Sequence, residues 1–268
     1  MWKKVKVINK INKQSYTYYH FQKDQRSPEW LKARVGRVTA SNANVASSGT
    51  SRFKTRDELA DELCGIKKSF NSPEAIERMQ HGIDNEPVAL SHLIKLTNLK
   101  IKERGLCIPE DDILTGFSPD GIIDSIDNQD TLGTTTNPQL GDGLVEIKNP
   151  QKMYFPLLQH QTMIEHGFIP DKYKHDHIYD SHYDQIQLSL HISKREWCIY
   201  FVFISEENYY KEIVYYNRKY TTDVLLPGIN YFIANYLLPR LKRFHLKVIT
   251  PTEFDIDDLT RKYQQYVN

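Results

Sequence analysis

The segment Gly143-Leu144-Val145-Glu146-Ile147-Lys148-Asn149-Pro150 alternates side-chain polarity with the period of two that is typical of a β-strand. This alternation places Glu146 and Lys148 on one face of the predicted strand and Val145 and Ile147 on the opposite, apolar face. An acid and an amine therefore share one surface.

A second segment, Gly116-Phe117-Ser118-Pro119-Asp120-Gly121, supplies another carboxylate. If the strand that bears Asp120 pairs with the first one, two carboxylates converge beside Lys148. Such a hard-oxygen site suits Mg²⁺ or Mn²⁺, and the Ile147 carbonyl would add a ligand. The metal would lower the pKa of a bound water, and Lys148 would orient or deprotonate that water or stabilise the transition state. By themselves, these residues also fit a cross-strand ion pair.

The rest of the chain predicts helices in the front third and strands after it. Helix starts are indicated at Ser27-Pro28-Glu29, at Thr55 to Glu58, and at Ser72-Pro73-Glu74, where the helix runs to Leu96 with a break at Gly82. Strands are predicted over residues 99–108, 113–124, 144–148, 196–205 and 209–216. Later helices are predicted over residues 179–193, over 225–246 with a kink at Pro239, and from Asp257. This order predicts an α/β domain with a mixed sheet over residues 27–268.

Two segments are predicted to lie outside that regular structure. Residues 1–26 are predicted to form a basic N-terminal arm or a short edge strand over Val5 to Ile8, and residues 125–143 a long hairpin loop. Residues 1–37 hold ten Lys and Arg against two acids, a net charge of +8, so the rest of the chain carries −7 of the total +1. The basic end is a candidate surface for a polyanion or a solvated face.

Composition excludes several classes of protein. With 268 residues, 40% hydrophobic and 26% charged, the chain predicts a globular domain rather than a disordered one. Without a run of about 18 apolar residues, and with a polar start after Trp2, we expect neither a membrane span nor a secretory signal. We therefore expect an intracellular protein, in the cytoplasm of the host or source cell, or in the nucleus of a eukaryote. Its three separated cysteines are expected to be reduced and structural; they are Cys64, Cys107 and Cys198.

The order of Asp120 before Glu146-Ile147-Lys148 is the signature of the PD-(D/E)xK nucleases, which have a restriction-endonuclease-like core with a central mixed β-sheet flanked by helices. Beyond that signature, the chain resembles the YqaJ-like viral recombinase family, to which lambda exonuclease belongs, in five places in the family's order. These are Glu29 to Ser41, Gly82 to Glu86 with Ala89, Ser118 to Gly121, Leu144 to Pro150, and Gln185-Ile186-Gln187.

The resemblance implies a role for each residue of the catalytic site. Asp120 and Glu146 are similar to the metal carboxylates, joined by the Ile147 carbonyl, and Lys148 is similar to the catalytic lysine. Glu86 resembles a helix-borne acid that serves as a second-metal or outer-shell ligand, and Gln185 resembles the glutamine that closes the site. The alternatives are an exposed helix acid for Glu86 and a helix-face amide for Gln185. Some relatives have a further upstream acid, for which this sequence offers Glu110, Asp111 or Asp112.

The segment from Trp30 to Ser41 resembles the family's end-recognition element. Residues implied in binding a 5′-phosphate or DNA are Trp30, Arg34, Thr39, Ser41 and Ser118. Arg34 offers a planar fork, and Thr39 to Ser41 open the next helix, where hydroxyls and free N–H groups favour an anion. The structural alternatives are that Arg34 pairs with a surface acid, that Ser41 only caps the helix, and that Trp30 packs in the core instead of stacking on a base.

Three histidines near the third quarter of the chain, His175, His177 and His182, have Asp176 and Asp180 as neighbours. These residue types bind zinc, but we expect no histidine-based metal site here because the resemblance already supplies a hard-metal site. A polar loop near DNA is the preferred interpretation.

The function implied by the resemblance is a Mg²⁺-dependent 5′-to-3′ exonuclease, in which Mn²⁺ would substitute for Mg²⁺. It would digest one strand of linear double-stranded DNA to 5′-mononucleotides and leave 3′ single-stranded tails for recombination. The implied partners are a duplex with a free 5′ end, a single-strand annealing protein and two further copies of the chain in a homotrimer. Alternatives are a structure-specific or restriction-type endonuclease of the same fold and a non-catalytic DNA-binding recombination scaffold.

Overall fold

The protein is described here by a computed structural model, which covers residues 1–8, 15–49, 54–67, 72–124, 127–128, 141–169, 171–172 and 174–267. Its centre is a five-stranded mixed sheet in the order β10-β9-β8-β7-β4, in which β8 and β9 are parallel and the other neighbours antiparallel. The strands are β4 (Ile101–Lys102), β7 (Gly121–Ile123), β8 (Gly143–Lys148), β9 (Trp197–Phe203) and β10 (Tyr209–Tyr215). The predicted α/β class with a mixed sheet is confirmed.

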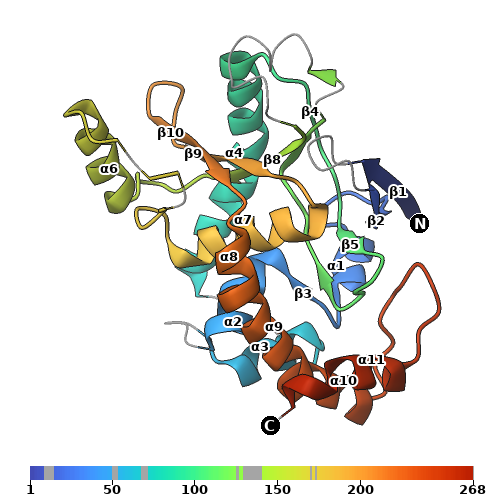
Figure 1. Ribbon diagram of the computed structural model, residues 1–268. Helices are drawn as coiled ribbons and strands as arrows, with labels where there is room; N and C mark the ends of the chain where they lie inside the picture. The colour runs from blue at the N-terminus through green and yellow to red at the C-terminus, as the bar shows by residue number, and fades with distance from the viewer. Residues whose placement is uncertain are drawn as a thin grey trace.

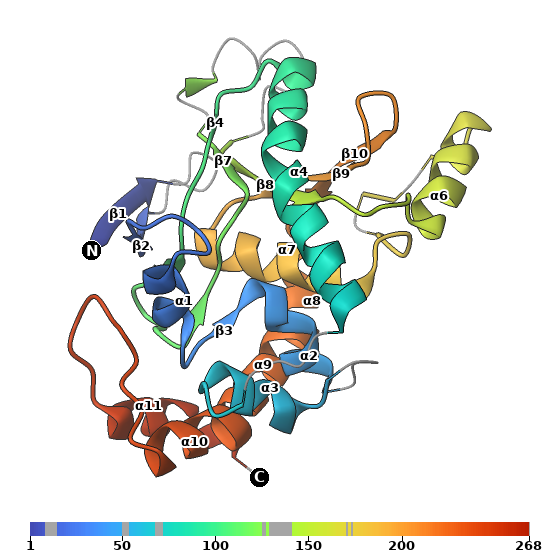
Figure 2. The same cartoon turned by 180° about the vertical axis from the view of Figure 1, so that it is seen from behind.

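Helices cover both faces of this sheet. On one face, Val145 and Ile147 of β8 belong to the same buried cluster as Ala89 and Leu93 of α4 (Pro73–Thr97), and Figure 2 shows α4 running across the front of β8. On the other face, Leu144 packs in the cluster that contains the apolar side chains of α7 (Asp180–Ser193). The predicted alternation of β8 is confirmed, because its two faces serve two different cores.

The predicted helix starts in the front third are confirmed. The side chains of Ser27, Thr55 and Ser72 each accept a hydrogen bond from a backbone N–H three residues later, which caps α1, α3 and α4. These helices and those that follow Thr39 are α1 (Pro28–Arg34), η1 (Ala40–Asn42), α2 (Ala43–Ser48) and α3 (Arg56–Leu63).

The predicted break of α4 at Gly82 is wrong. The helix runs without interruption from Pro73 to Thr97, although it contains both Gly82 and Pro87. A glycine inside a helix costs only about 1 kcal/mol, which burial of Ala89 and Leu93 against the sheet offsets.

The described parts of residues 1–26 contain two strands that pack on the domain and do not form a separate arm. Strands β1 (Trp2–Ile8) and β2 (Ser15–Phe21) pair antiparallel and extend onto β5 (Cys107–Pro109) in a second, three-stranded sheet. Tyr18 and Phe21 are buried in the main core, so hydrophobic burial holds the hairpin to the domain. The predicted edge strand is confirmed, and it is longer than residues 5–8.

Two of the predicted strands are each divided between different sheets. The segment 99–108 contributes β4 to the central sheet and β5 to the hairpin sheet. The segment 113–124 contributes β6 (Thr115–Gly116), which pairs in parallel with β3 (Val38–Thr39), and then β7. Pro119 lies between β6 and β7 and has no N–H to donate to a ladder, which is a local reason for the interruption.

The predicted helix over residues 225–246 begins earlier, at Arg218, and runs to Arg243. Its parts are α8 (Arg218–Tyr220), η3 (Thr221–Leu225), α9 (Leu226–Phe232), η4 (Ile233–Leu237) and α10 (Leu238–Arg243). Both η3 and η4 are wide π-type turns, each followed two residues later by a proline, Pro227 or Pro239. A wide turn accommodates the missing proline N–H, so both prolines, and not only Pro239, mark irregularities.

The remaining elements are α6 (Phe155–Glu165), α11 (Ile256–Tyr263) and η5 (Gln264–Tyr266). Sequence analysis did not predict α6, which projects from the body of the molecule (Figures 1 and 2).

All three cysteines are free and buried, as predicted. Most of the predicted 125–143 loop lies outside the described residues. Within the described ranges no helix has the length and apolar character needed to cross a bilayer.

A buried arginine joins the ends of β7 and β8. The Arg195 guanidinium donates to the carbonyls of Ile123 (2.9 Å) and Gly143 (3.2 Å) and to Asp124 Oδ1 (2.9 Å), and its side chain is 2% exposed. Both strands therefore depend on one cation at the end opposite to Asp120 and Lys148.

We predict that Arg195→Met lowers the free energy of unfolding by about 3–5 kcal/mol, because it leaves Asp124 and two carbonyls without their buried donor. Urea denaturation measures the loss. The control is Lys102→Ala, which removes a more exposed partner of the same Asp124 carboxylate and is expected to cost less than about 1 kcal/mol. Equal losses in the two variants would contradict the prediction.

Candidate active site

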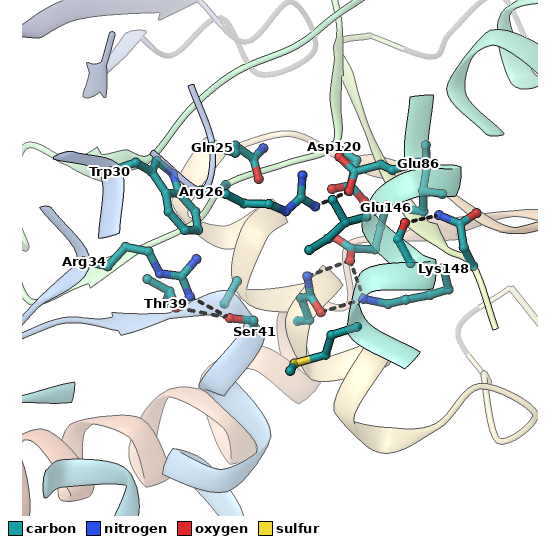
Figure 3. A pocket seen from close by; sticks show the side chains of 18 residues that line it. Gln25, Arg26, Trp30, Arg34, Thr39, Ser41, Glu86, Asp120, Glu146 and Lys148 are labelled. Carbon is teal, nitrogen blue, oxygen red and sulfur yellow. Dashed lines mark hydrogen bonds and ion pairs between the residues drawn. The ribbon is translucent and has the colours of Figure 1, made fainter. Parts of the chain in front are cut away.

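Pairing of β7 with β8 brings the two predicted carboxylates together. Gly121 lies opposite Val145, so Asp120 meets the next residues of β8, and its Oδ2 accepts a hydrogen bond from the Ile147 N–H at 2.6 Å. Asp120, Glu146 and Lys148 all line one cavity of about 490 Å³ (Figure 3). The structure therefore brings together the three residues on which the sequence analysis depends.

Lys148 is held inside a small hydrogen-bonded network. Its ammonium donates to Glu146 Oε1 (2.6 Å) and to Gln185 Oε1 (3.0 Å), and the Gln185 amide donates to the same Glu146 oxygen (2.6 Å). Gln185 comes from α7, so a helix on the other side of the cavity fixes both charged groups of β8. The helix-face amide alternative for Gln185 is wrong.

Glu86 reaches the same cavity from α4. Its side chain is 24% exposed and forms an ion pair with Arg26, so the exposed-acid alternative is wrong. The upstream acids, by contrast, lie elsewhere. Glu110 pairs with Lys4, the Tyr263 hydroxyl donates to Asp112, and none of Glu110, Asp111 and Asp112 is among the described residues that line the catalytic cavity.

Burial and the closeness of several carboxylates together determine the electrostatics of this cavity. Burial raises the pKa of Asp120 well above its usual value, and the nearby Glu146 and Glu86 raise it further. For Lys148, burial alone would lower the pKa, but Glu146 and Asp120 outweigh burial and raise it. The lysine is thus held as a cation among acids that repel one another.

A cradle of hydroxyl groups around Arg34 lies across the cavity from Lys148. The Arg34 guanidinium donates to Thr39 Oγ1 (2.8 Å) and Ser41 Oγ (3.2 Å), and it lies 4.3 Å from the centre of the Trp30 ring. Burial lowers the pKa of Arg34 to about 10. Within the described part of the chain no carboxylate lies within 4 Å of Arg34, so the surface ion-pair alternative is wrong.

Trp30 and Ser118 complete this cradle. Trp30 is 6% exposed and packs in the core, as its structural alternative predicted, while one ring face also lines the cavity beneath Arg34. The Ser118 hydroxyl is buried and has no hydrogen-bond partner among the described residues, although it borders the cavity. A buried hydroxyl without a partner is a candidate group for a ligand.

Residues 29–196 match the YqaJ-like viral recombinase domain, which is more than half of the chain. The chain belongs to the YqaJ-like viral recombinase family. A search of curated proteins finds no match.

Among solved structures, the chain is similar to an alkaline exonuclease (LHK-Exo) from Laribacter hongkongensis, with 22% identity and a TM-score of 0.54 over 89% of this chain and 99% of that one. A second structure of LHK-Exo, in complex with dAMP, has 20% identity and the same TM-score and coverage. The shared fold is the PD-(D/E)xK-like fold of these exonucleases, as predicted.

The donor set of this YqaJ-like site fits a hard divalent cation. Asp120, Glu146 and Glu86 offer carboxylate oxygens around one cavity, which Ile147, the residue between Glu146 and Lys148, also lines. Burial and the neighbouring acids raise the pKa of Asp120, and a divalent cation bound here would offset both by stabilising the carboxylate form.

Sequence analysis missed several residues that line the cavity, among them Gln25, Arg26 and Asn149. The Gln25 amide donates to the carbonyls of Arg104 and Pro119 (both 3.0 Å), and the Asn149 amide donates to the Gly82 carbonyl (3.1 Å). Gln25 and Arg26 precede the segment that matches the family. Their only sequence signal is their position before the Ser27 cap.

The histidines form a separate cluster, and it includes His160, which sequence analysis did not consider. Glu212 on β10 accepts hydrogen bonds from the rings of His175 (3.0 Å) and His177 (2.6 Å) and from the Tyr210 hydroxyl. His182 lies elsewhere and bonds the Tyr200 hydroxyl (2.8 Å). The cluster is therefore built around one carboxylate.

His160, His177 and Glu212 offer ligand-type atoms that lie within 4.8 Å of one another. However, the rings of His160 and His177 stack face to face, 3.6 Å apart and 2° from parallel. Rings that bind one ion through their in-plane lone pairs converge on it, so this stack would have to open first. We interpret the cluster as structural, since His160 and Leu157 are the buried residues of α6 and attach it to the sheet.

We predict that Glu212→Gln lowers the free energy of unfolding by about 2–4 kcal/mol at pH 7. Burial alone would raise the pKa of Glu212, but hydrogen bonds from His175 and His177 outweigh it and lower the pKa to about 2. Since this pKa is depressed, the carboxylate adds stability above its unfolded pKa of 4.5 and loses it as the pH falls through about 2.

Urea denaturation between pH 7 and pH 2.5 measures this difference, which should shrink below pH 4.5. Glu165→Gln, on the exposed side of α6, serves as the control and should change little. A difference that stays constant over this pH range would contradict the assignment.

Proposed function

We propose that this protein is a Mg²⁺-dependent 5′-to-3′ exonuclease that acts on linear double-stranded DNA. The observation that carries the proposal is one cavity in which Asp120, Glu146 and Lys148 face the Arg34 cradle. Membership of the YqaJ-like family and the fold shared with alkaline exonucleases support a nuclease of the lambda-exonuclease type.

Asp120, Glu146, the Ile147 carbonyl and Glu86 are the groups that would hold Mg²⁺ or Mn²⁺. The cation, when bound, supplies a more acidic water and neutralises charge on the scissile phosphate. Lys148, fixed by Glu146 and Gln185, presents an ammonium to that phosphate and to the attacking water. Gln185 acts by holding the lysine and the carboxylate in register.

The Arg34 cradle would bind the 5′-terminal phosphate. A terminal phosphate carries more charge than an internal diester, and Arg34 offers it a desolvated guanidinium with the hydroxyls of Thr39, Ser41 and Ser118 nearby. Hydrolysis of the next diester would then release a 5′-mononucleotide. The LHK-Exo complex with dAMP, a nucleotide of that kind, is consistent with such a product.

The remaining partners of the proposed reaction follow from the family. The enzyme would act inside the cell on duplexes with a free 5′ end and leave 3′ single-stranded tails for a strand-annealing protein. A homotrimer around the DNA would explain processive digestion. An endonuclease of the same fold and a non-catalytic scaffold are the alternatives that the following experiments exclude or support.

We predict that Asp120→Ala and Lys148→Ala each lower the rate of digestion by at least about 100-fold, because the first removes a carboxylate that would hold the cation and the second removes the ammonium that stabilises the reacting phosphate. The measurement uses a linear duplex labelled separately at both ends of each strand, with Mg²⁺ or EDTA, and a covalently closed circle. Wild type should release label from 5′ ends and leave the circle intact. Cutting of the circle would support an endonuclease, and full activity of either variant would exclude the mechanism.

We predict that Arg34→Ala slows digestion of 5′-phosphorylated ends by about 10- to 100-fold, since it removes charge-assisted hydrogen bonds to the terminal phosphate. Digestion from 5′-hydroxyl ends should change much less. Initial rates on the two substrates, with Arg34→Lys as the charge-retaining control, give the comparison. An unchanged preference between the two ends would exclude the cradle as a phosphate site.

A further inference from the structure

Arg26 occupies a backbone conformation that its side chain does not favour. It lies in a tight turn in which the Ser27 N–H donates to the Asp24 carbonyl (3.2 Å), and its φ is +69°. This left-handed conformation costs an L-residue other than glycine about 1–2 kcal/mol. An interaction of the arginine side chain is therefore expected to compensate for this cost.

The turn is tied to the catalytic strand. The Gln25 side chain donates to the carbonyls of Arg104 and Pro119, and Pro119 directly precedes Asp120. From this fixed position the Arg26 guanidinium extends into the cavity and donates to Glu86, as Figure 3 shows. Arg26 is 43% exposed and Glu86 24%, so solvent and substrate can both reach the pair.

The pair stands between two cavities. The catalytic cavity and a neighbouring one of about 280 Å³ share Gln25, Arg26, Glu86 and Asp120 as lining residues. A DNA backbone that entered either cavity would contact the Arg26 guanidinium close to the catalytic carboxylates.

Charge explains what an arginine does at this place. Three acids, Glu86, Asp120 and Glu146, line the catalytic cavity, and three cations, Lys148, Arg26 and Arg34, line it with them. With all six groups ionised the charges sum to zero, whereas glycine in place of Arg26 would leave −1 beside an incoming phosphodiester. The Coulomb energy of that extra charge opposes DNA binding and favours a divalent cation.

We propose that Arg26 is a built-in counter-cation of the catalytic cavity: it neutralises Glu86 in the free enzyme and moves its guanidinium to a DNA phosphate when substrate binds, which frees Glu86 for the metal. This proposal rests on the proposed nuclease function. Arg26 then has opposite effects on the two ligands, because it attracts DNA and competes with the metal for Glu86.

The test is Arg26→Gly in the full-length protein, because glycine suits a positive φ and should leave the melting temperature unchanged or higher. In EDTA, affinity for a 5′-phosphorylated duplex, measured by fluorescence anisotropy, should fall about 5- to 20-fold. The slope of log affinity against log salt should shrink by about 0.9, the value of one phosphate contact. Without DNA, Mn²⁺ titrated calorimetrically should bind about 3- to 10-fold more tightly.

Two further variants act as controls. Arg26→Lys keeps the charge and should restore most of the affinity for DNA. Glu86→Gln releases Arg26, so DNA should bind more tightly in EDTA while Mn²⁺ binds more weakly. In the Arg26→Gly background, Glu86→Gln should raise DNA affinity less than it does in the wild type, because only the loss of the Glu86 charge remains and no guanidinium is released.

Weaker binding of both ligands by Arg26→Gly would show a merely structural role, and no change in either would show an idle surface ion pair. Each result overturns the proposal. Digestion of a linear duplex by wild type tests the nuclease function separately. If wild type digests DNA but the opposite shifts are absent, only the role of Arg26 fails; if wild type digests nothing, the proposed function fails.

Discussion

Antiparallel pairing of β7 with β8 is the constraint on which the site depends. Nineteen residues separate these strands in the sequence, and their register places Asp120 where the Ile147 N–H donates to it. A shift of one residue would turn Glu146 and Lys148 into the apolar cluster beneath α4 and bring Val145 and Ile147 to the cavity. Burial of those two side chains therefore specifies the position of the charged ones.

The same pairing creates an electrostatic cost that other elements offset. Burial, and then repulsion from Glu146 and Glu86, raises the pKa of Asp120. Lys148 of β8 and Gln185 of α7 each donate a hydrogen bond to Glu146. Arg26, in the turn before α1, forms an ion pair with Glu86. Three elements that are remote in sequence thus hold a carboxylate cluster which would otherwise protonate or separate.

Sequence predicted those parts of the site that follow from local pattern. Period-two alternation placed Glu146 and Lys148 on one face, and cap signals placed the starts of α1, α3 and α4. The grouping of Arg34 with Thr39 and Ser41 in one element was predicted from the family resemblance. Each of these relations spans a few residues, or a motif whose geometry is already known.

Other features depend on contacts that no local pattern encodes. The side-chain polarity of residues 15–21 alternates only weakly, so the sequence does not predict that Tyr18 and Phe21 are buried. Their burial depends on the pairing of β2 with β5, which is distant in sequence. His160 meets His177 across α6 and the loop before α7, and Arg26 has a positive φ that its sequence neighbours do not predict. A helix break at Gly82 was predicted from propensity, which packing against the sheet overrode.

The distance between the Arg34 cradle and the catalytic acids is set by a short piece of backbone. Thr39 of β3 lies opposite Gly116 of β6, and only Phe117, Ser118 and Pro119 separate Gly116 from Asp120. A Cβ on Gly116 would lie 3.0 Å from the Cys107 carbonyl oxygen, so glycine permits this close approach of β6 to β5. Because the cradle and the carboxylates are attached to opposite ends of this connection, their separation cannot vary freely. A cavity of fixed length with a phosphate site at one end would measure each cut from the strand's own terminus, and a closed circle has no terminus to offer it.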